Sequence, residues 1–265
     1  MDPLAGVRRV EVVRVTPYYR DAYATLYHAD SRELLPDMAA RAKRFDMLYT
    51  DPVWPVPNAS PVRLAGHEDP VGLFAECAQH FAALTDRVVI HLGCRVDPRL
   101  LAPITLPFMR QSVIGFAIPG HYGRILVSHE VLYAFGAPPP ARVGRHLIGG
   151  CKSIDVGIEE IEFGQRIINR ELGLRAQAKL GGHPCPRNIQ GVSQALRWFA
   201  DGPVLDPFAG SGTTLVAAKR MGIKAIGIEI EERYCELAAR RLADTQPPLP
   251  IPVEDEPRDV QMVLA

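Results

Sequence analysis

The stretch VLDPFAGSGTT, residues Val204–Thr214, decides the fold. Its apolar start predicts a short buried strand that ends at Asp206, and a turn of small residues, Gly210-Ser211-Gly212, follows. Thr213 and Thr214 then open an amphipathic segment that predicts a helix. A strand, a glycine turn and a helix N-terminus in this order let the backbone come close to a nucleotide-like ligand. The stretch therefore predicts an α/β protein with a ligand site at this turn.

Two further predicted strands end on acidic residues. Lys224–Ile230 carries Glu229 near its end, roughly 20 residues past the turn, where a carboxylate can reach the hydroxyl pair of a ribose. Tyr23–Ala29 runs into Asp30, and either Asp30 or Ser31 suits the N-cap of a following helix. Two alternatives stay open: the glycine turn is a corner built for packing, and Asp30 is a helix cap alone.

A second chemical motif follows the apolar strand Phe45–Thr50. It is Asp51-Pro52-Val53-Trp54, which places a carboxylate and an aromatic ring at the end of a buried strand. The alternative interpretation is a turn that contains a proline and a core tryptophan.

Together these motifs resemble those of the DNA amino-methyltransferases. Asp206-Pro207-Phe208 and the glycine turn match the family's S-adenosylmethionine signature, D-P-F-x-G-S-G-T-T, at every position. The segment Asp51–Trp54 resembles the family's D-P-P followed by an aromatic residue, with Val53 in place of the second proline. His183-Pro184 resembles a segment that precedes the cofactor motif, with Asn188 where the family has a last proline. The motif order implies the beta-type arrangement, and phage-like modification methylases look most similar.

The resemblance implies a Rossmann-like S-adenosylmethionine-dependent methyltransferase fold. Its sheet would be seven-stranded and mostly parallel, with helices on both faces, a reversed final hairpin and a small recognition insert. One domain is expected over residues 1–244, with a catalytic half at 24–136, an insert at about 137–182 and a cofactor half at 183–244. Residues 245–265 are expected to form a flexible tail rich in proline and acid. The implied cofactor contacts are Asp30, His183, Pro184, Asp206, Pro207, Phe208, Gly210, Ser211, Gly212, Thr213, Thr214 and Glu229.

The resemblance also implies the chemistry. Asp51 and the carbonyl of Pro52 would accept the two hydrogens of an exocyclic amine, and Trp54 would stack on a base flipped out of the duplex. Val53 leaves the loop an amide hydrogen and more freedom than proline would. Adenine N6 is favoured over cytosine N4 because the tetrapeptide begins with Asp. S-adenosylmethionine is the expected cofactor, and no metal is expected.

The charge distribution favours a nucleic-acid partner. The 265 residues have no net charge and are 47% hydrophobic, as in an ordinary globular protein. Residues 110–197 nevertheless hold eleven Lys or Arg and six Asp or Glu, a net of +5. A solvated charged surface is the alternative. The expected nucleic-acid contacts are His121, Tyr122, Arg124, Arg142, Arg145 and Lys152.

Five scattered cysteines without a paired motif indicate a reducing compartment, and no apolar run approaches the ~18 residues of a membrane span. A cytoplasmic protein is therefore expected, and similar enzymes make a homodimer possible. Three other functions stay open: the same fold acting on RNA, protein or a small molecule, a non-catalytic DNA- or cofactor-binding relative, and, less favoured, a nicotinamide dehydrogenase.

The remaining expected elements follow from hydrophobic periodicity. His91 is expected to be a satisfied core or rim histidine. The expected segments are an edge strand at Val10–Val15, a helix at Asp69–Leu84, strands at Arg87–Cys94, Val113–Ile118 and Val131–Phe135, and helices at Ile189–Phe199 and Glu231–Leu242.

Overall fold

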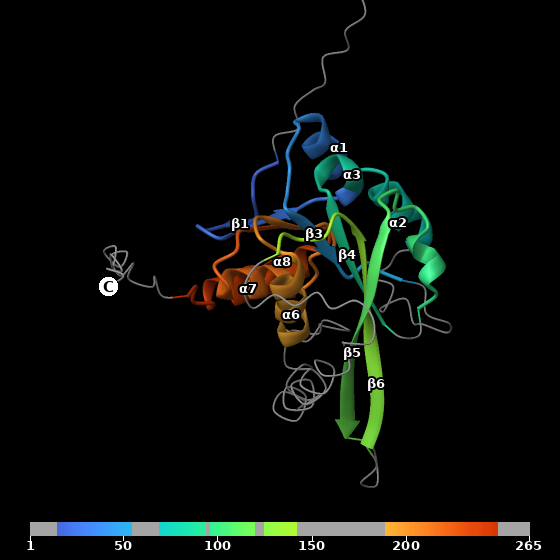
Figure 1. Cartoon of the computed structure of the whole chain (residues 1–265). Helices are drawn as coiled ribbons and strands as arrows, with labels where there is room; N and C mark the ends of the chain where they lie inside the picture. Colours follow the sequence, from blue (N-terminus) through green and yellow to red (C-terminus); the bar gives the residue numbers. More distant parts are fainter. Residues whose placement is uncertain (1–14, 55–68, 94–95, 120–124, 142–188, 249–265) are drawn as a thin grey trace, which may run out of the picture.

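The computed structural model describes residues 15–54, 69–93, 96–119, 125–141 and 189–248. Their strands form one eight-stranded sheet in the order β1-β2-β8-β7-β3-β4-β6-β5 (Figure 1). The strands are β1 (Tyr19–Arg20), β2 (Ala24–His28), β3 (Met47–Thr50), β4 (Arg87–Gly93), β5 (Phe108–Pro119), β6 (Ile125–Gly136), β7 (Val204–Asp206) and β8 (Ala225–Glu229).

The five central strands, β2, β8, β7, β3 and β4, run parallel, and β6 is antiparallel to both β4 and β5. The predicted α/β class, mostly parallel sheet and reversed hairpin are confirmed. The sheet has one strand more than the seven predicted, because the two-residue β1 pairs antiparallel with β2 at the edge. The expected edge strand at Val10–Val15 falls outside the described residues except for Val15, which is not in a strand.

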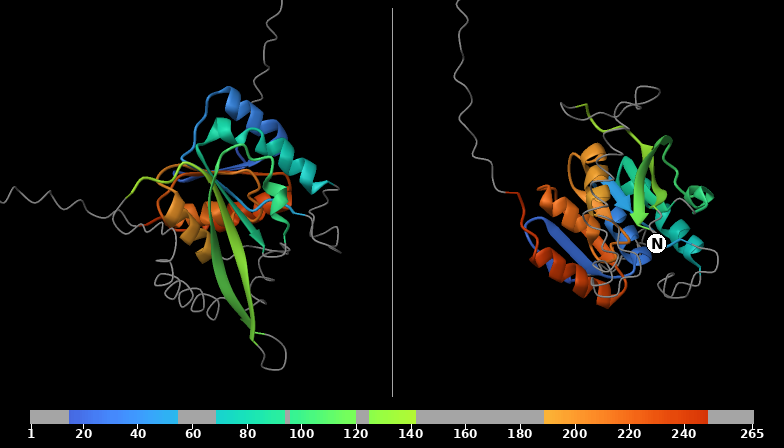
Figure 2. Two further views of the ribbon diagram at one scale, coloured as in Figure 1. Left: turned by 45° about the vertical axis from the view of Figure 1, so that its right-hand side comes forward. Right: turned by 90° about the horizontal axis from the view of Figure 1, so that it is seen from below.

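Helices cover both faces of the sheet, as predicted (Figure 1, Figure 2). The first core cluster joins one face to α6, α7 and α8 through residues such as Val192, Leu215 and Ala238. The second core cluster joins the other face to α1, α2 and α3 through residues such as Leu35 and Phe74. The helices are α1 (Ser31–Ala40), α2 (Pro70–Ala78), α3 (Phe81–Leu84), the 3-10 helix η1 (Pro98–Leu101), α6 (Ile189–Phe199), α7 (Thr213–Arg220) and α8 (Glu232–Ala243).

Two predicted segments differ from the observed ones. The single helix expected over Asp69–Leu84 is two helices, because the chain tightens where the N–H of His80 bonds to the carbonyl of Cys77 at 3.1 Å, three residues back. The hairpin β5–β6 is longer than predicted. Strand β6 pairs with β4 over Glu130 to Gly136, and Glu130 lies opposite Gly93. The earlier part of β6 pairs with β5 alone, and there the hairpin projects beyond the sheet (Figure 1, Figure 2).

The strand order places a switch point between β7 and β3. From β7 the chain passes through α7 to β8 on one side, and from β3 it passes through α2 and α3 to β4 on the other side. In open parallel sheets, ligands bind at the carboxyl ends of the strands beside such a point. Thr50 and Asp206, the last residues of β3 and β7, therefore mark the edge of the sheet at which to look for a site.

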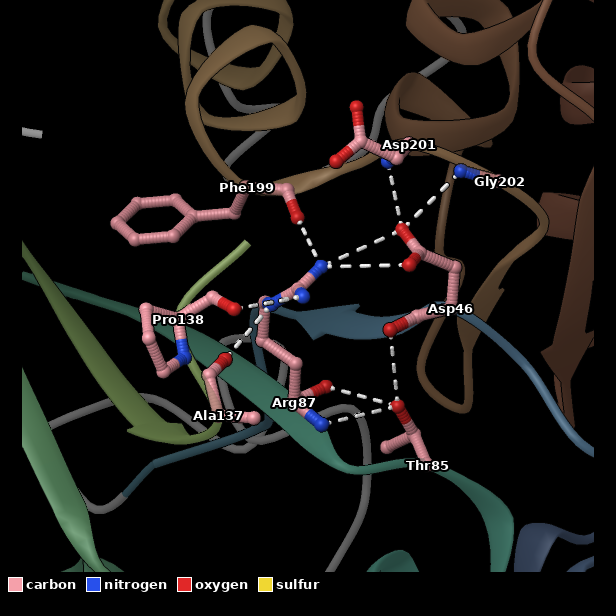
Figure 3. Close-up of polar contacts among 8 residues, drawn as sticks. All are labelled: Asp46, Thr85, Arg87, Ala137, Pro138, Phe199, Asp201 and Gly202. Atoms are coloured by element: carbon pink, nitrogen blue, oxygen red, sulfur yellow. Dashed lines mark hydrogen bonds and ion pairs between the residues drawn. The ribbon is translucent and has the colours of Figure 1, made fainter. Parts of the chain in front are cut away.

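At the amino ends of the parallel strands, Arg87, the first residue of β4, holds several segments together (Figure 3). Its guanidinium donates to the carbonyl oxygens of Phe199 at 2.6 Å and Ala137 at 2.9 Å, and its Nη1 lies 3.3 Å from Oδ1 of Asp46. Asp46 also accepts the N–H of Asp201 at 2.6 Å. This cluster ties the amino ends of β3 and β4 to the segment before β7 and to the end of β6.

Among the residues that the structure describes, no helix has the length and apolar character that would let it cross a membrane. The same residues contain no group of three or more His, Cys, Asp or Glu side chains placed to share a metal ion.

Candidate active site

The glycine turn joins β7 to α7 through two residues with left-handed backbone, Gly210 at φ 51° and Gly212 at φ 76°. A Cβ on Gly212 would lie 2.7 Å from the Cβ of Ala238 in α8. Both the backbone conformation and this contact therefore exclude a side chain at Gly212. The strand, turn and helix predicted here are confirmed, with α7 beginning at Thr213.

Glu229, the last residue of β8, holds the turn from the neighbouring strand. One carboxylate oxygen accepts the N–H of Gly210 at 2.7 Å, and the other accepts the N–H of Glu231 at 2.8 Å. Burial raises the pKa of Glu229, and the N–H donors oppose that rise. Its place at the strand end is as predicted, whereas its bond to the turn has no signal in the sequence.

Asp206 is buried at the centre of the same edge. Its Oδ1 accepts a hydrogen bond from the Thr50 hydroxyl at 2.8 Å and another from the N–H of Phe208 at 3.0 Å. Burial raises the pKa of Asp206 to about 6 although the donors, which include Thr214, act to lower it, and the negative charge of Asp51 contributes to the rise. A titratable group shifted this far at a strand end marks a candidate functional site.

The bond between Thr50 and Asp206 joins segments 156 positions apart. Asp51 follows Thr50 directly, so the segment Asp51–Trp54 starts beside the glycine-turn motif. The negative charge of Asp51 also contributes to the raised pKa of Asp206, as expected for a neighbouring carboxylate. The two motifs that the sequence singles out thus lie side by side at the switch point.

Trp54 connects the ends of β3 and β4. Its Cζ2 lies 3.8 Å from the position that a Cβ of Gly93 would take, and the indole packs against the second core cluster. Pro52 is buried, whereas Asp51, Val53 and Trp54 are partly exposed. Asp51 and Trp54 therefore keep part of their surface exposed just beyond the end of β3.

The N-terminus of α1 packs against the entry to the glycine turn. Asp30 caps the helix by accepting the N–H of Arg32 at 2.8 Å, and it also pairs with the Arg32 guanidinium at 2.6 Å. The Ser31 hydroxyl donates to the carbonyl oxygen of Pro207 at 2.5 Å. The predicted cap is confirmed, and the expected contact of Asp30 with a cofactor stays a prediction.

Arg241 of α8 supports the turn from behind, and sequence reasoning missed it. Its Nη1 donates to the carbonyl oxygen of Ser211 at 2.5 Å, to the Ser211 hydroxyl at 3.0 Å and to the Thr213 hydroxyl at 3.1 Å. Burial lowers the pKa of this guanidinium from its usual value. Nothing in the local sequence separates it from its neighbour Arg240, whose partner is Glu236 on the same helix.

Several expected site residues lie outside the described part of the chain. They are His121, Tyr122, Arg124, Arg142, Arg145, Lys152, His183 and Pro184.

Comparison with known proteins agrees with the motifs. Residues 181–240 match the family model described as DNA methylase, for the N6 and N4 enzymes. Over this segment the chain is similar to the N6/N4 DNA methylases. Type II methyltransferase M2.LlaDCHI of Lactococcus lactis subsp. cremoris is 59% identical over 39 residues, which is 15% of this chain and 14% of that protein. The putative methylase YubD of Escherichia coli K12 is 41% identical over 66 residues, 24% of this chain and 29% of that protein.

Two solved structures show the same fold as this chain. The M1.HpyAVI–SAM complex matches with a TM-score of 0.53 at 21% identity, over 83% of this chain and 98% of that chain. PvuII DNA methyltransferase, titled cytosine-N4-specific, matches with a TM-score of 0.52 at 16% identity, over 86% of this chain and 89% of that chain. The curated relatives match only short segments, less than a third of their own length in each case described above.

Proposed function

We propose that this protein transfers a methyl group from S-adenosylmethionine to the exocyclic amine of a DNA base. The observation that carries the proposal is the hydrogen bond between Thr50 and Asp206. Through it, the carboxylate of Asp51 stands beside the glycine turn at the switch point of the sheet, where a cofactor and a reacting base can meet.

The residues around the turn fit this cofactor. Gly210 and Gly212 keep side chains away from the backbone, so a ligand can approach it closely. S-adenosylmethionine carries two positive groups, a sulfonium and an ammonium, and the buried carboxylate of Asp206 would provide a countercharge for them. Glu229 lies at the next strand end, where the ribose of a nucleoside is expected. When bound, the cofactor supplies an electrophilic methyl group on sulfur.

The protein's part in the chemistry is to prepare the amine. The lone pair of an exocyclic amino nitrogen is delocalised into the ring, so the nitrogen is a poor nucleophile. Asp51 and the carbonyl oxygen of Pro52 accept its two hydrogens and localise the lone pair on nitrogen. The nitrogen would then take the methyl group, the cofactor would leave as the neutral thioether with the electron pair of the broken bond, and one amino proton would pass to solvent. These hydrogen bonds strengthen as positive charge develops on nitrogen, which is where they accelerate the reaction.

The reacting base must leave the duplex to reach Asp51. Trp54, partly exposed beside Gly93, offers a face on which the flipped base stacks. We propose adenine N6 as the target, on the ground that the tetrapeptide begins with Asp, and cytosine N4 as the alternative, which the fold shared with the PvuII enzyme keeps open. The beta-type arrangement, the contacts expected at residues 121–152 and a homodimer belong to the same proposal.

The test is transfer of tritium from labelled S-adenosylmethionine to duplex DNA from a methylation-free host, with RNA as a parallel substrate. Mass spectrometry of the digested product then separates N6-methyladenine from N4-methylcytosine. Asp51→Asn should slow transfer by about a hundredfold or more while the cofactor still binds. The matched control is Asp86→Asn, an exposed carboxylate at the other edge of the sheet, which should leave transfer unchanged. Equal rates for the two variants would refute the role of Asp51, and labelling of RNA alone would refute DNA as the substrate.

A further inference from the structure

Three polar side chains form a chain of hydrogen bonds across β3, β4 and β6. The Tyr49 hydroxyl lies 2.6 Å from Nδ1 of His91, and Nε2 of His91 lies 2.8 Å from Oε2 of Glu130. Tyr49 and His91 are each 1% exposed, and the Glu130 side chain is 21% exposed. We call these residues the Tyr49–His91–Glu130 network. None of the groups assigned to methyl transfer above belongs to it.

The network interrupts an apolar layer. On the same face of the sheet, Met47, Val89 and Leu132 belong to the first core cluster and are fully buried. Replacing a buried polar network by apolar side chains of similar volume is often neutral or stabilising, so stability alone does not call for these three groups. A satisfied polar network does fix the relative positions of its members, because any displacement leaves a buried group without its partner.

The network constrains the strand end that precedes Asp51. With its proton on Nε2, the His91 ring donates to Glu130 and accepts from the Tyr49 hydroxyl. Tyr49 is therefore anchored towards β4 and β6, while the next residue, Thr50, is anchored to Asp206 on β7. The backbone that carries Asp51 thus begins from a strand end held on both sides.

Glu130, the partly exposed end of the network, lies close to Trp54, the other candidate substrate contact. Glu130 is the residue of β6 that pairs with Gly93, and Gly93 is the residue of β4 beside Trp54. Glu130 therefore lies at the edge where β4 meets the indole. The network links the strand ends on which both Asp51 and Trp54 depend.

We infer that Tyr49, His91 and Glu130 are positioning residues for the transfer step, an inference that rests on the proposed function. They hold the end of β3 so that the Asp51 carboxylate meets the amine at hydrogen-bond distance. A displacement of about 1 Å in such a group lowers a rate by up to about a hundredfold. Cofactor binding at the glycine turn does not involve the network, so its loss should affect transfer and leave cofactor affinity intact.

The experiment measures single-turnover transfer of tritium from labelled S-adenosylmethionine to duplex DNA, and the Kd for the cofactor, in the full chain. Tyr49→Phe removes one hydroxyl and should slow transfer by about tenfold or more, with the Kd changed less than about twofold. Tyr133→Phe removes a hydroxyl from the opposite face of the same sheet and is the matched control, with no change expected. Glu130→Gln keeps an oxygen that accepts from His91 and should retain more activity than Glu130→Leu. The double variant Tyr49→Phe/His91→Leu should be no slower than the slower single variant.

The inference is overturned if Tyr49→Phe and Tyr133→Phe transfer at the same rate. It is also overturned if every slow variant loses cofactor affinity or thermal stability in proportion, because that pattern belongs to a purely structural role. Normal rates in the network variants together with an inactive Asp51→Asn would defeat the inference and leave the proposed function standing. Absence of transfer to any nucleic acid by the unaltered protein would defeat both.

Discussion

At Asp206, burial and hydrogen bonding act on the pKa in opposite directions, and burial prevails. The folded-state pKa is about 6, whereas the ordinary value is 3.8. Below the ordinary value the carboxyl is protonated in both folded and unfolded chains, and above about pH 6 it is ionised in both. The contribution of Asp206 to stability is therefore present at low pH and is lost as the pH rises from about 4 to about 6. A bound cation reverses this balance, because it favours the ionised carboxylate.

We therefore predict that S-adenosylmethionine displaces a proton from Asp206. Calorimetry at pH 6 in two buffers of different ionisation enthalpy should report release of about half a proton on binding, and much less at pH 7. In Asp206→Asn the buffer dependence should vanish along with part of the affinity. Identical binding enthalpies in both buffers at pH 6 would contradict a contact between the positively charged cofactor and the Asp206 carboxylate.

Gly212 shows why one residue of the turn cannot vary. Its φ of 76° disfavours any side chain, and an added Cβ would lie 2.7 Å from the Cβ of Ala238. Gly212→Ala should lower the free energy of unfolding by more than about 1 kcal/mol and weaken cofactor binding. Gly191→Ala in helix α6 is the control, because the added Cβ would make an ordinary contact 3.6 Å from the Ile114 side chain. Urea titration should place the Gly191 variant at or above the original midpoint; equal midpoints for both variants would be incompatible with a strained turn.

At the scale of elements, α8 supports the glycine turn. Ala238 packs against Gly212, and Arg241 donates three hydrogen bonds to Ser211 and Thr213. Arg241→Met should leave the Ser211 carbonyl oxygen without this donor and weaken cofactor affinity by about tenfold to a hundredfold, as expected for the loss of a charge-assisted hydrogen bond. The measurement is the Kd for S-adenosylmethionine by calorimetry.

The control for Arg241 is its neighbour Arg240, which is exposed and pairs with Glu236 on the same helix. Arg240→Met should leave the Kd within about twofold, as is usual for a solvated ion pair. If Arg241→Met also binds the cofactor normally, α8 supports the fold and has no part in binding.

The elements also show which features the sequence can reveal. Strand β7, the turn and α7 were predictable because an apolar run is followed by Gly210 and Gly212, which local backbone geometry requires. The break between α2 and α3 was not, because Phe81 and Leu84 continue the apolar face of α2 across it. The partners Thr50–Asp206, His91–Glu130 and Arg241–Ser211 were not predictable either, since each is a side-chain contact set by tertiary packing.

At the scale of the whole molecule, the carboxyl ends and the amino ends of the parallel strands differ in role. The carboxyl edge holds the glycine turn and Asp51, with buried carboxylates whose pKa values are raised at a cost to stability. The amino edge holds the cluster around Arg87 and Asp46, in which one guanidinium joins the starts of β3 and β4 to the approach of β7 (Figure 3). We expect the second edge to supply rigidity that the first edge lacks.

This division predicts that the Arg87 cluster can be weakened without loss of the site's intrinsic affinity. Arg87 has a side-chain exposure of 6%, so Arg87→Leu removes a buried guanidinium with its hydrogen bonds to Phe199 and Ala137 and leaves the partly exposed Asp46 without its countercharge. The free energy of unfolding should fall by more than about 2 kcal/mol. Arg44 pairs with Asp86 on the surface at 45% exposure, and Arg44→Leu should cost less than about 1 kcal/mol. Urea titration gives both values, and calorimetry well below the melting temperature gives the Kd for S-adenosylmethionine. A Kd unchanged in Arg87→Leu, with the folded population intact, supports independent edges, whereas a Kd that rises with the loss of stability would mean that the starts of β3 and β7 set the spacing between Asp51 and the glycine turn.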